Sequence, residues 1–284
     1  MAEVYRATAN EGKFAGRRVA LKRLMPELAK DPHYVELFTN ESDLSRMLHH
    51  PNVIEVLDAG VLKDTYFIAM DFIDGRDLGQ VLARCRQRRI QLPIDFAVFL
   101  VKTLLDALDY AHNLTAPSGK ALHVVHCDVS PSNMFISRVG EIKLGDFGIA
   151  KVRSLEGASG PNKVFGKAYY LSPEQLDGKL GPSIDLWAAA VTLYELLTLE
   201  RPFSGTTADE IARKIRSGHL RPVTEVRPEV FPPLAELLHK ALSLNPDERF
   251  PTARAFSDAL LPHFNELIGT PLAIAAVVRG LFGA

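Results

Sequence analysis

The spacing of apolar residues changes once along this chain, close to the turn-forming pair Asp74-Gly75. Upstream, short runs rich in β-branched and aromatic residues predict strands, and one helical pattern spans residues 35–48. Downstream, apolar residues mostly recur at helical spacing. Because strands gather in one part and helices in the other, the sequence predicts an α+β fold with a small strand-rich lobe and a large helical lobe. The predicted strands cover residues 18–24, 53–57 and 66–72, and the later helices cover residues 93–113, 183–199, 207–217 and 233–242.

Composition excludes several classes of function. With 47% hydrophobic and 24% charged residues, the chain of 284 residues has the balance of a soluble globular protein. Its formal net charge of −1 gives no overall field that would attract nucleic acid or an anionic membrane surface. We expect the densest basic run, residues 84–89, to be a solvated helix end rather than a docking patch. The two cysteines, Cys85 and Cys127, cannot form a disulfide framework, which favours a cytoplasmic location.

The last 14 residues, 271–284, form an apolar run that is too short to span a bilayer and is interrupted by Arg279. We therefore expect a terminal helix packed on the domain, and the chain to contain no membrane segment. The alternative is a stub that leads to a membrane or regulatory segment.

Four polar motifs occur in a fixed order along the chain. Lys22 ends an apolar strand, Glu41 lies in the helix that follows, and Asp128 stands five residues before Asn133. The triplet Asp-Phe-Gly at 146–148 then follows a short predicted strand over 141–144. Each motif alone is weak, since Lys22 read singly is an ordinary strand-end lysine and Glu41 a solvated helix residue. Together they suit phosphoryl transfer, which asks a protein for positioning and charge neutralisation rather than covalent chemistry.

This set of motifs resembles the eukaryotic-like (Hanks-type) bacterial serine/threonine protein kinases, over residues 1 to about 265. The resemblance implies a two-lobed kinase that uses ATP to phosphorylate Ser or Thr hydroxyls on protein substrates. It assigns Lys22 to the α- and β-phosphates, Glu41 to holding Lys22, and Asp128 to the role of catalytic base. Asn133 and Asp146 become the oxygen ligands of Mg²⁺ (or Mn²⁺).

The same resemblance places an adenine pocket around the segment that joins the lobes. The backbone at Asp71 and Ile73 would meet the adenine edge, and Asp77 would reach the ribose. Met70 would close the back of the pocket, while apolar residues from both lobes would sandwich the ring, although each could equally be plain core. The residues assigned to ATP are Val4, Ala20, Lys22, Met70, Asp71, Ile73, Asp77 and Phe135.

The large lobe carries the signs of a protein substrate. Residues 172–174 read Ser-Pro-Glu where the family has Ala-Pro-Glu, closing the segment that opens at Asp146. Small-molecule kinases of related fold lack this segment. The resemblance implies that Glu174 pairs with Arg249, which matches the family's arginine partner of this glutamate, and a buried ion pair of this kind holds geometry. The residues assigned to structure or to the activation segment are His126, Phe147, Gly148, Lys167, Glu174, Asp185 and Arg249.

The sequence departs from the family pattern at four places. Residues 1–4 resemble the tail of the glycine-rich loop, so we expect the first strand and two glycines to lie upstream of residue 1. Cys127 replaces an arginine that normally pairs with an activation-loop phosphate. Ser130 replaces a lysine that contacts the γ-phosphate, and Lys167 replaces a threonine. Either Lys167 supplies the charge that Ser130 lacks, or it is a surface lysine without a role.

The predicted organisation is a kinase N-lobe over residues 1–73, incomplete at its start, and a C-lobe over 74–284. The expected partners are ATP and a protein with a Ser or Thr acceptor, and not nucleic acid. The alternative is a pseudokinase that serves as a signalling scaffold or nucleotide-binding regulator, which the departures favour. The intact set of motif residues favours an enzyme.

Overall fold

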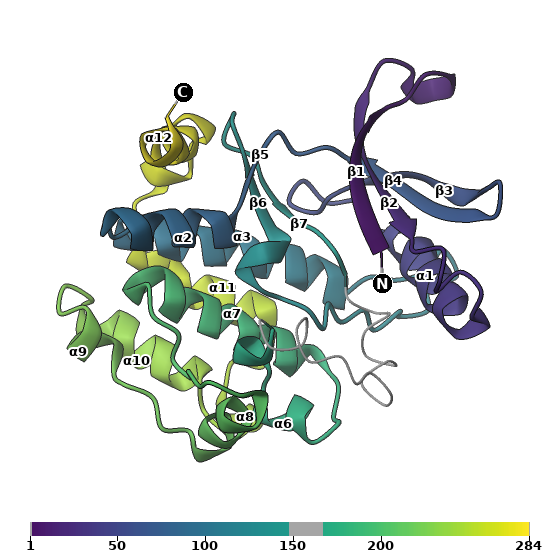
Figure 1. The fold of residues 1–284 in the computed structure, drawn as a ribbon. Helices are drawn as coiled ribbons and strands as arrows, with labels where there is room; N and C mark the ends of the chain where they lie inside the picture. Colours follow the sequence, from purple (N-terminus) through teal and green to yellow (C-terminus); the bar gives the residue numbers. More distant parts are fainter. Residues whose placement is uncertain (1, 148–166, 284) are drawn as a thin grey trace.

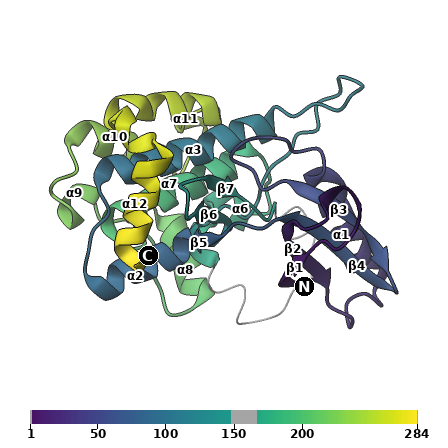
Figure 2. The same ribbon diagram turned by 90° about the horizontal axis from the view of Figure 1, so that it is seen from above.

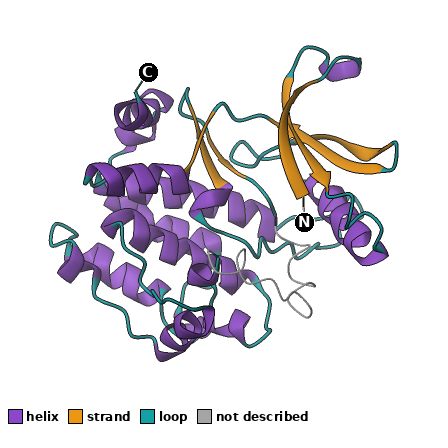
Figure 3. Cartoon of the chain, viewed as in Figure 1, coloured by secondary structure: helices purple, strands orange, loops and turns teal. Residues whose placement is uncertain are grey.

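A computed structural model describes residues 2–147 and 167–283, and it shows two lobes of different composition (Figures 1 and 3). Figure 3 places the larger group of strands in one lobe and nearly all helices in the other. This segregation confirms the α+β prediction. The four-stranded sheet uses residues 2–71, and the chain from residue 75 onward belongs with the helical lobe. The lobe boundary at 73/74 stays our proposal.

The N-lobe is an antiparallel sheet with one helix beside it. Its strands lie in the order β1-β2-β4-β3, so β1 is an edge strand. The helix α1 begins at Pro32 because the Asp31 side chain accepts the His33 N–H at 2.9 Å and caps it. Leu24, Phe38 and Ile68 form the small core between sheet and helix. The elements are β1 (Ala2–Thr8), η1 (Gly12–Phe14), β2 (Arg18–Leu24), α1 (Pro32–Ser45), β3 (Val56–Leu62) and β4 (Thr65–Asp71).

Strand register gathers the predicted nucleotide residues on one face of this sheet. Val4 of β1 lies opposite Lys22 of β2, and Ala20 of β2 lies opposite Met70 of β4. Directly opposed residues share a face of an antiparallel pair, and so do residues two apart in one strand. The four side chains therefore project from the same face, although they come from three strands.

The C-lobe is built around α3 and α7. The helix α7 is apolar on all sides, and its buried residues extend from Ile184 to Thr198, which is typical of a helix inside a core. A small sheet, β5-β6-β7, lies between these helices and the N-lobe (Figure 1). The first elements are β5 (Gly75–Asp77), α2 (Leu78–Arg88), α3 (Ile94–His112), η2 (Pro131–Asn133), β6 (Met134–Ser137) and β7 (Ile142–Leu144). The next are η3 (Ala168–Tyr170), α6 (Pro173–Leu176), α7 (Pro182–Thr198), α8 (Ala208–Ser217), α9 (Val223–Val226) and α10 (Pro232–Ala241). The last are η4 (Pro246–Glu248), α11 (Ala253–Leu260), η5 (Leu261–His263), η6 (Glu266–Gly269) and α12 (Pro271–Phe282).

The predicted terminal helix is present as α12, which packs against α2 and β6 (Figure 2). It buries Ile274, Ala275, Val278 and Leu281. Arginines of α2 hold its C-terminal end: Arg84 donates to the Leu281 carbonyl and Arg88 to the Gly280 carbonyl, each at 3.0 Å. The basic run therefore ends a helix as expected, but these arginines bind backbone carbonyls instead of being merely solvated. Among the described residues, no helix is both long and apolar enough to cross a membrane.

The strand predicted over 53–57 was misplaced. Val53 makes an isolated bridge to Leu144 of β7, and the Ile54 N–H donates to the Leu144 carbonyl at 2.8 Å. This segment thus pairs with the other lobe, and the strand β3 runs over Val56–Leu62 instead, with an irregularity in register between Val56 and Asp58. The apolar run marked where the chain is buried, whereas partner geometry decided which part became the strand.

Candidate active site

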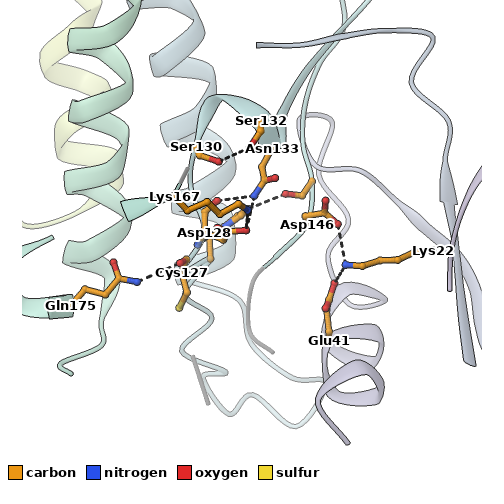
Figure 4. Close-up of polar contacts among 12 residues, drawn as sticks. Lys22, Glu41, Cys127, Asp128, Ser130, Ser132, Asn133, Asp146, Lys167 and Gln175 are labelled. Atoms are coloured by element: carbon orange, nitrogen blue, oxygen red, sulfur yellow. Dashed lines mark hydrogen bonds and ion pairs between the residues drawn. The ribbon is translucent and has the colours of Figure 1, made fainter. Parts of the chain in front are cut away.

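Lys22, Glu41 and Asp146 meet between the lobes (Figure 4). The Lys22 ammonium lies 2.5 Å from Glu41 Oε1 of α1 and 3.1 Å from Asp146 Oδ1, just beyond β7. Burial by itself lowers the pKa of Lys22, but Asp146 and Glu41 outweigh it, so the pKa of Lys22 is raised above its usual value. The lysine is therefore a fixed positive charge, and the predicted pairing with Glu41 is present.

A second cluster surrounds Asp128. The Asn133 amide donates to the Asp128 carbonyl at 2.7 Å and to the Asp128 Oδ2 at 3.0 Å. The Lys167 ammonium forms an ion pair with the same carboxylate oxygen, as Figure 4 shows. Lys167 is thus no isolated surface lysine. It delivers a positive charge to Asp128 from 39 residues further along the chain.

Asp185, in the first turn of α7, anchors the loop that carries Asp128, residues 126–133, which we call the catalytic loop. Its carboxylate accepts the backbone N–H groups of His126 at 2.8 Å and Cys127 at 2.9 Å, and it also pairs with the His112 ring at 2.8 Å. Cys127 has a positive φ of 62°, a conformation that costs a non-glycine residue about 1 kcal/mol or more. We conclude that Asp185 stabilises this strained backbone next to Asp128.

His126 is a neutral structural residue. Burial lowers its pKa, and its Nδ1 accepts the Asp128 backbone N–H at 3.2 Å, which requires that nitrogen to be unprotonated. The other ring nitrogen then donates to the Gly145 carbonyl at 3.1 Å. The buried Phe147 ring lies 4.4 Å from the imidazole, centroid to centroid. His126 therefore links the catalytic loop to the Asp-Phe-Gly segment.

Cys127 cannot replace the charge of an arginine. Burial raises the pKa of its thiol, and Asp185 and Asp128 raise it further. The neutral thiol lies 3.5 Å from the Val125 carbonyl. The departure read from the sequence is therefore a true loss of positive charge at this position.

The residues assigned to adenine come from four strands, β1, β2, β4 and β6, and from the segment after β4, where Ile73 lies. Val4, Ala20 and Met70 share the sheet face of Lys22, and Phe135 of β6 lies opposite Asp77 of β5. Met70 also lines a small cavity together with Glu41 and Asp146. Its place at the back of the adenine pocket stays a prediction.

Two acidic residues of this region already have structural partners. Asp71 pairs with Arg17 at 2.6 Å, and burial raises the pKa of its carboxyl group. Asp77 accepts the Gln80 N–H at 2.9 Å and caps α2. The ribose role of Asp77 therefore stays a prediction.

The expected Glu174–Arg249 pair is formed. Both terminal nitrogens of Arg249 donate hydrogen bonds to the Glu174 carboxylate, at 2.7 and 2.9 Å. The Ser183 hydroxyl donates a third hydrogen bond to the same carboxylate at 2.9 Å. Burial opposes ionisation of Glu174, but the Arg249 hydrogen bonds outweigh it and lower its pKa. Arg249 also lies over the Trp187 ring of α7, so the pair ties residues 172–174 to the buried core.

A cluster around Glu195 was not predicted. This carboxylate on α7 is 1% exposed, and it pairs with Arg86 of α2 at 2.6 Å and Arg201 at 3.4 Å. The Tyr170 hydroxyl also donates to it. Glu195 is the only charged residue in the stretch 186–198 of α7, and that is the signal that could have revealed it, because a carboxylate buried there requires partners.

The residues that could hold a divalent cation are Asn133 and Asp146. Among the described residues, no group of three His, Cys, Asp or Glu side chains could bind a metal ion by itself. Mg²⁺ is usually held by one or two protein oxygens together with substrate phosphates, and an amide plus a carboxylate fit that pattern. Gly148, the end of the Asp-Phe-Gly triplet, lies outside the described residues.

Comparison with known proteins decides the family. The sequence model described as protein kinase domain matches residues 1–261. This chain belongs to the protein kinase family. A crystal structure of the PknI kinase domain of Mycobacterium tuberculosis superposes with a TM-score of 0.67 at 30% identity, covering 92% of this kinase and 90% of that chain.

Full-length relatives are also bacterial kinases. MasK of Myxococcus xanthus, named a tyrosine-protein kinase, is 36% identical over all of this chain and 44% of its own length. The serine/threonine-protein kinase PknA of M. tuberculosis is 32% identical over 92% of this chain and 58% of its length. The serine/threonine-protein kinase PrkC of Bacillus subtilis is 32% identical over 89% of this chain and 37% of its length. These relatives are bacterial protein kinases, named for serine/threonine or for tyrosine, and the chain spans between 37% and 58% of their length.

Proposed function

We propose that this kinase transfers the γ-phosphoryl group of ATP to a Ser or Thr hydroxyl of a protein, with Asp128 as the catalytic base. The observation that carries the proposal is the ion pair of Lys167 with Asp128. It supplies, from a different segment, the cation that Ser130 lacks. The roles of phosphate binding, lysine positioning and metal binding then also have residues in the contacts described: Lys22, Glu41, Asn133 and Asp146.

In this mechanism Asp128 orients the acceptor hydroxyl and accepts its proton. Lys167 neutralises charge that develops on the transferred group, since a cation held there in advance stabilises the transition state. Lys22 binds the α- and β-phosphates and is kept in place by Glu41. Asn133 and Asp146 would hold a Mg²⁺ ion, which would supply positive charge that neutralises the phosphates.

The named relatives differ in which hydroxyl accepts the phosphate, that of Ser and Thr or that of Tyr. PknA and PrkC are named serine/threonine kinases and MasK is named a tyrosine kinase. We propose Ser and Thr, because the catalytic set matches that pattern once Lys167 takes the place of the lysine missing at position 130. Acid hydrolysis of a phosphorylated substrate and separation of the phosphoamino acids decides between them, and phosphotyrosine as the sole product would contradict the assignment.

A nucleotide-binding regulator without transfer is the second candidate. It is favoured by the neutral thiol at Cys127, where the family has an arginine. Such a protein would bind Mg-ATP, raise its melting temperature on binding, and transfer no phosphate.

The decisive experiment measures phosphoryl transfer from radiolabelled ATP to a generic protein substrate. Asp128→Asn should lower the rate about 10²–10⁴-fold, because a positioned base is lost, and it should leave the melting temperature nearly unchanged. The control is Asp209→Asn, at an exposed residue in the first turn of α8. Undiminished transfer by Asp128→Asn would remove the assigned base. ATP binding without transfer by the unaltered chain would favour the regulator.

A further inference from the structure

A groove of about 320 Å³ opens beside the catalytic loop. Its walls come from α2, the catalytic loop, η3 and the region where α7 ends. Ser130, Lys167 and Tyr170 also line the small cavity that contains Asp128, so the two spaces are adjacent. A peptide whose hydroxyl reaches Asp128 therefore places neighbouring residues in this groove. The side chains that matter here are Arg86, Ser130, Lys167, Tyr170, Glu195 and Arg201.

The Glu195 carboxylate in the groove already has partners within the protein. Glu195 is 1% exposed and is held by Arg86, Arg201 and the Tyr170 hydroxyl. The two arginines are more open, since 38% of the Arg86 side chain and 34% of the Arg201 side chain are exposed. Parts of both arginine side chains are thus within reach of a bound peptide, whereas Glu195 is buried.

The charges of the described lining do not cancel. Arg86, Arg201 and Lys167 are cationic, and Glu195 is the only carboxylate among the described residues of this lining. When the negative charge of Asp128 is counted as well, because it pairs with Lys167, the described residues still carry a net charge of about +1. The groove is thus complementary to an anion and repels a cation. A planar guanidinium matches carboxylate and phosphate oxygens, which strengthens the preference.

We propose that this groove selects protein substrates that carry an anionic side chain, a carboxylate or a phosphate, close to the acceptor hydroxyl. Arg86 and Arg201 are the specificity-determining residues, and Glu195 is the positioning residue that fixes both guanidinium groups. The inference rests on the proposed function, because it concerns the protein substrate of the same site.

The test compares kcat/KM of the unaltered chain on one acceptor peptide whose flanking residues are Glu, phosphoserine, Gln or Arg. We expect Glu to exceed Gln by about fivefold, or about 1 kcal/mol, as for a partly exposed ion pair. Phosphoserine should exceed Glu because it carries more charge. An advantage confined to phosphoserine would assign the groove to phosphate, and one shared with Glu would assign it to anions generally. Equal rates, or the highest rate on the Arg peptide, would overturn the inference and leave the proposed function intact.

Two variants locate the effect. Arg86→Gln and Arg201→Gln should each bring the Glu-to-Gln ratio toward one. The control Arg88→Gln lies in the same last turn of α2 but bonds to α12, and it should keep the ratio. Retention of the ratio in both groove variants would overturn the assignment. If one variant fails to fold because Glu195 loses a partner, the other variant and the unaltered chain still decide. Absence of transfer to every peptide while ATP binds would contradict the proposed function, and this inference with it.

Discussion

Replacing Lys167 by alanine tests the link between Lys167 and catalysis. Two unit charges about 4 Å apart interact by about 4 kcal/mol at an effective dielectric constant of about 20. Lys167 keeps 35% of its side chain exposed, so water weakens the interaction, and we take about half of it to act on the transition state. A loss of about 2 kcal/mol corresponds to a fall in kcat of about 30-fold.

Folding should change much less than the rate. A partly exposed ion pair contributes about 1 kcal/mol or less, which corresponds to about 2–4 °C in melting temperature for a chain of this size. The assay is steady-state transfer from radiolabelled ATP, with a thermal melt of each variant. Lys179→Ala is the matched control, because Lys179 is exposed and lies near the same segment.

A rescue variant makes the interpretation specific. Ser130 is buried and lines both the cavity around Asp128 and the larger adjoining groove, so a lysine side chain at that position would extend into the groove beside Asp128. Adding Ser130→Lys to the Lys167→Ala variant should raise its kcat about tenfold. An unchanged kcat in Lys167→Ala would show that Lys167 does not act in catalysis. A lower kcat that Ser130→Lys does not restore would show that the lysine is needed at position 167 itself.

Stability offers two more tests. The pKa of Glu174 is lower in the folded chain than in the unfolded chain. Its pairing with Arg249 therefore adds fully to the free energy of unfolding at pH values above the unfolded pKa. This contribution is lost as the pH falls through the folded pKa. Urea denaturation should therefore show Glu174→Gln less stable at pH 7, with the difference shrinking below about pH 4, whereas a difference independent of pH would contradict the pairing. Gly140 and Gly119 both have positive φ, 88° and 83°, so alanine should cost each about 1 kcal/mol. A Cβ at Gly140 would lie 1.9 Å from a carbonyl oxygen of α12, while at Gly119 it meets nothing within 4 Å. Gly140→Ala should be the less stable by at least about 1 kcal/mol in urea, and equal stabilities would argue against this docking of α12.

The fold class and the residues with chemical roles could be predicted from the residue pattern alone. Helical spacing predicted α3 within one residue at each end, because a long amphipathic pattern has one way to bury its apolar face. Lys22, Asp128, Asn133 and Asp146 were identified because their order and spacing resemble the kinase motifs, and phosphate chemistry explains why those residue types are needed. The Glu174–Arg249 pair was expected from the same resemblance. The roles of these residues toward ATP stay proposals.

Which charged side chains meet depends on how the elements pack in space. Lys167 and Asp128 are 39 residues apart, and the sequence left open whether they touch. Arg86 looked like part of a solvated basic run, yet α2 and α7 pack so that it reaches Glu195, 109 residues away. Contacts of this kind depend on how rigid elements are placed, and no local pattern encodes that placement. A charge inside an apolar helix signals that it needs a partner, but only packing determines which side chain supplies it.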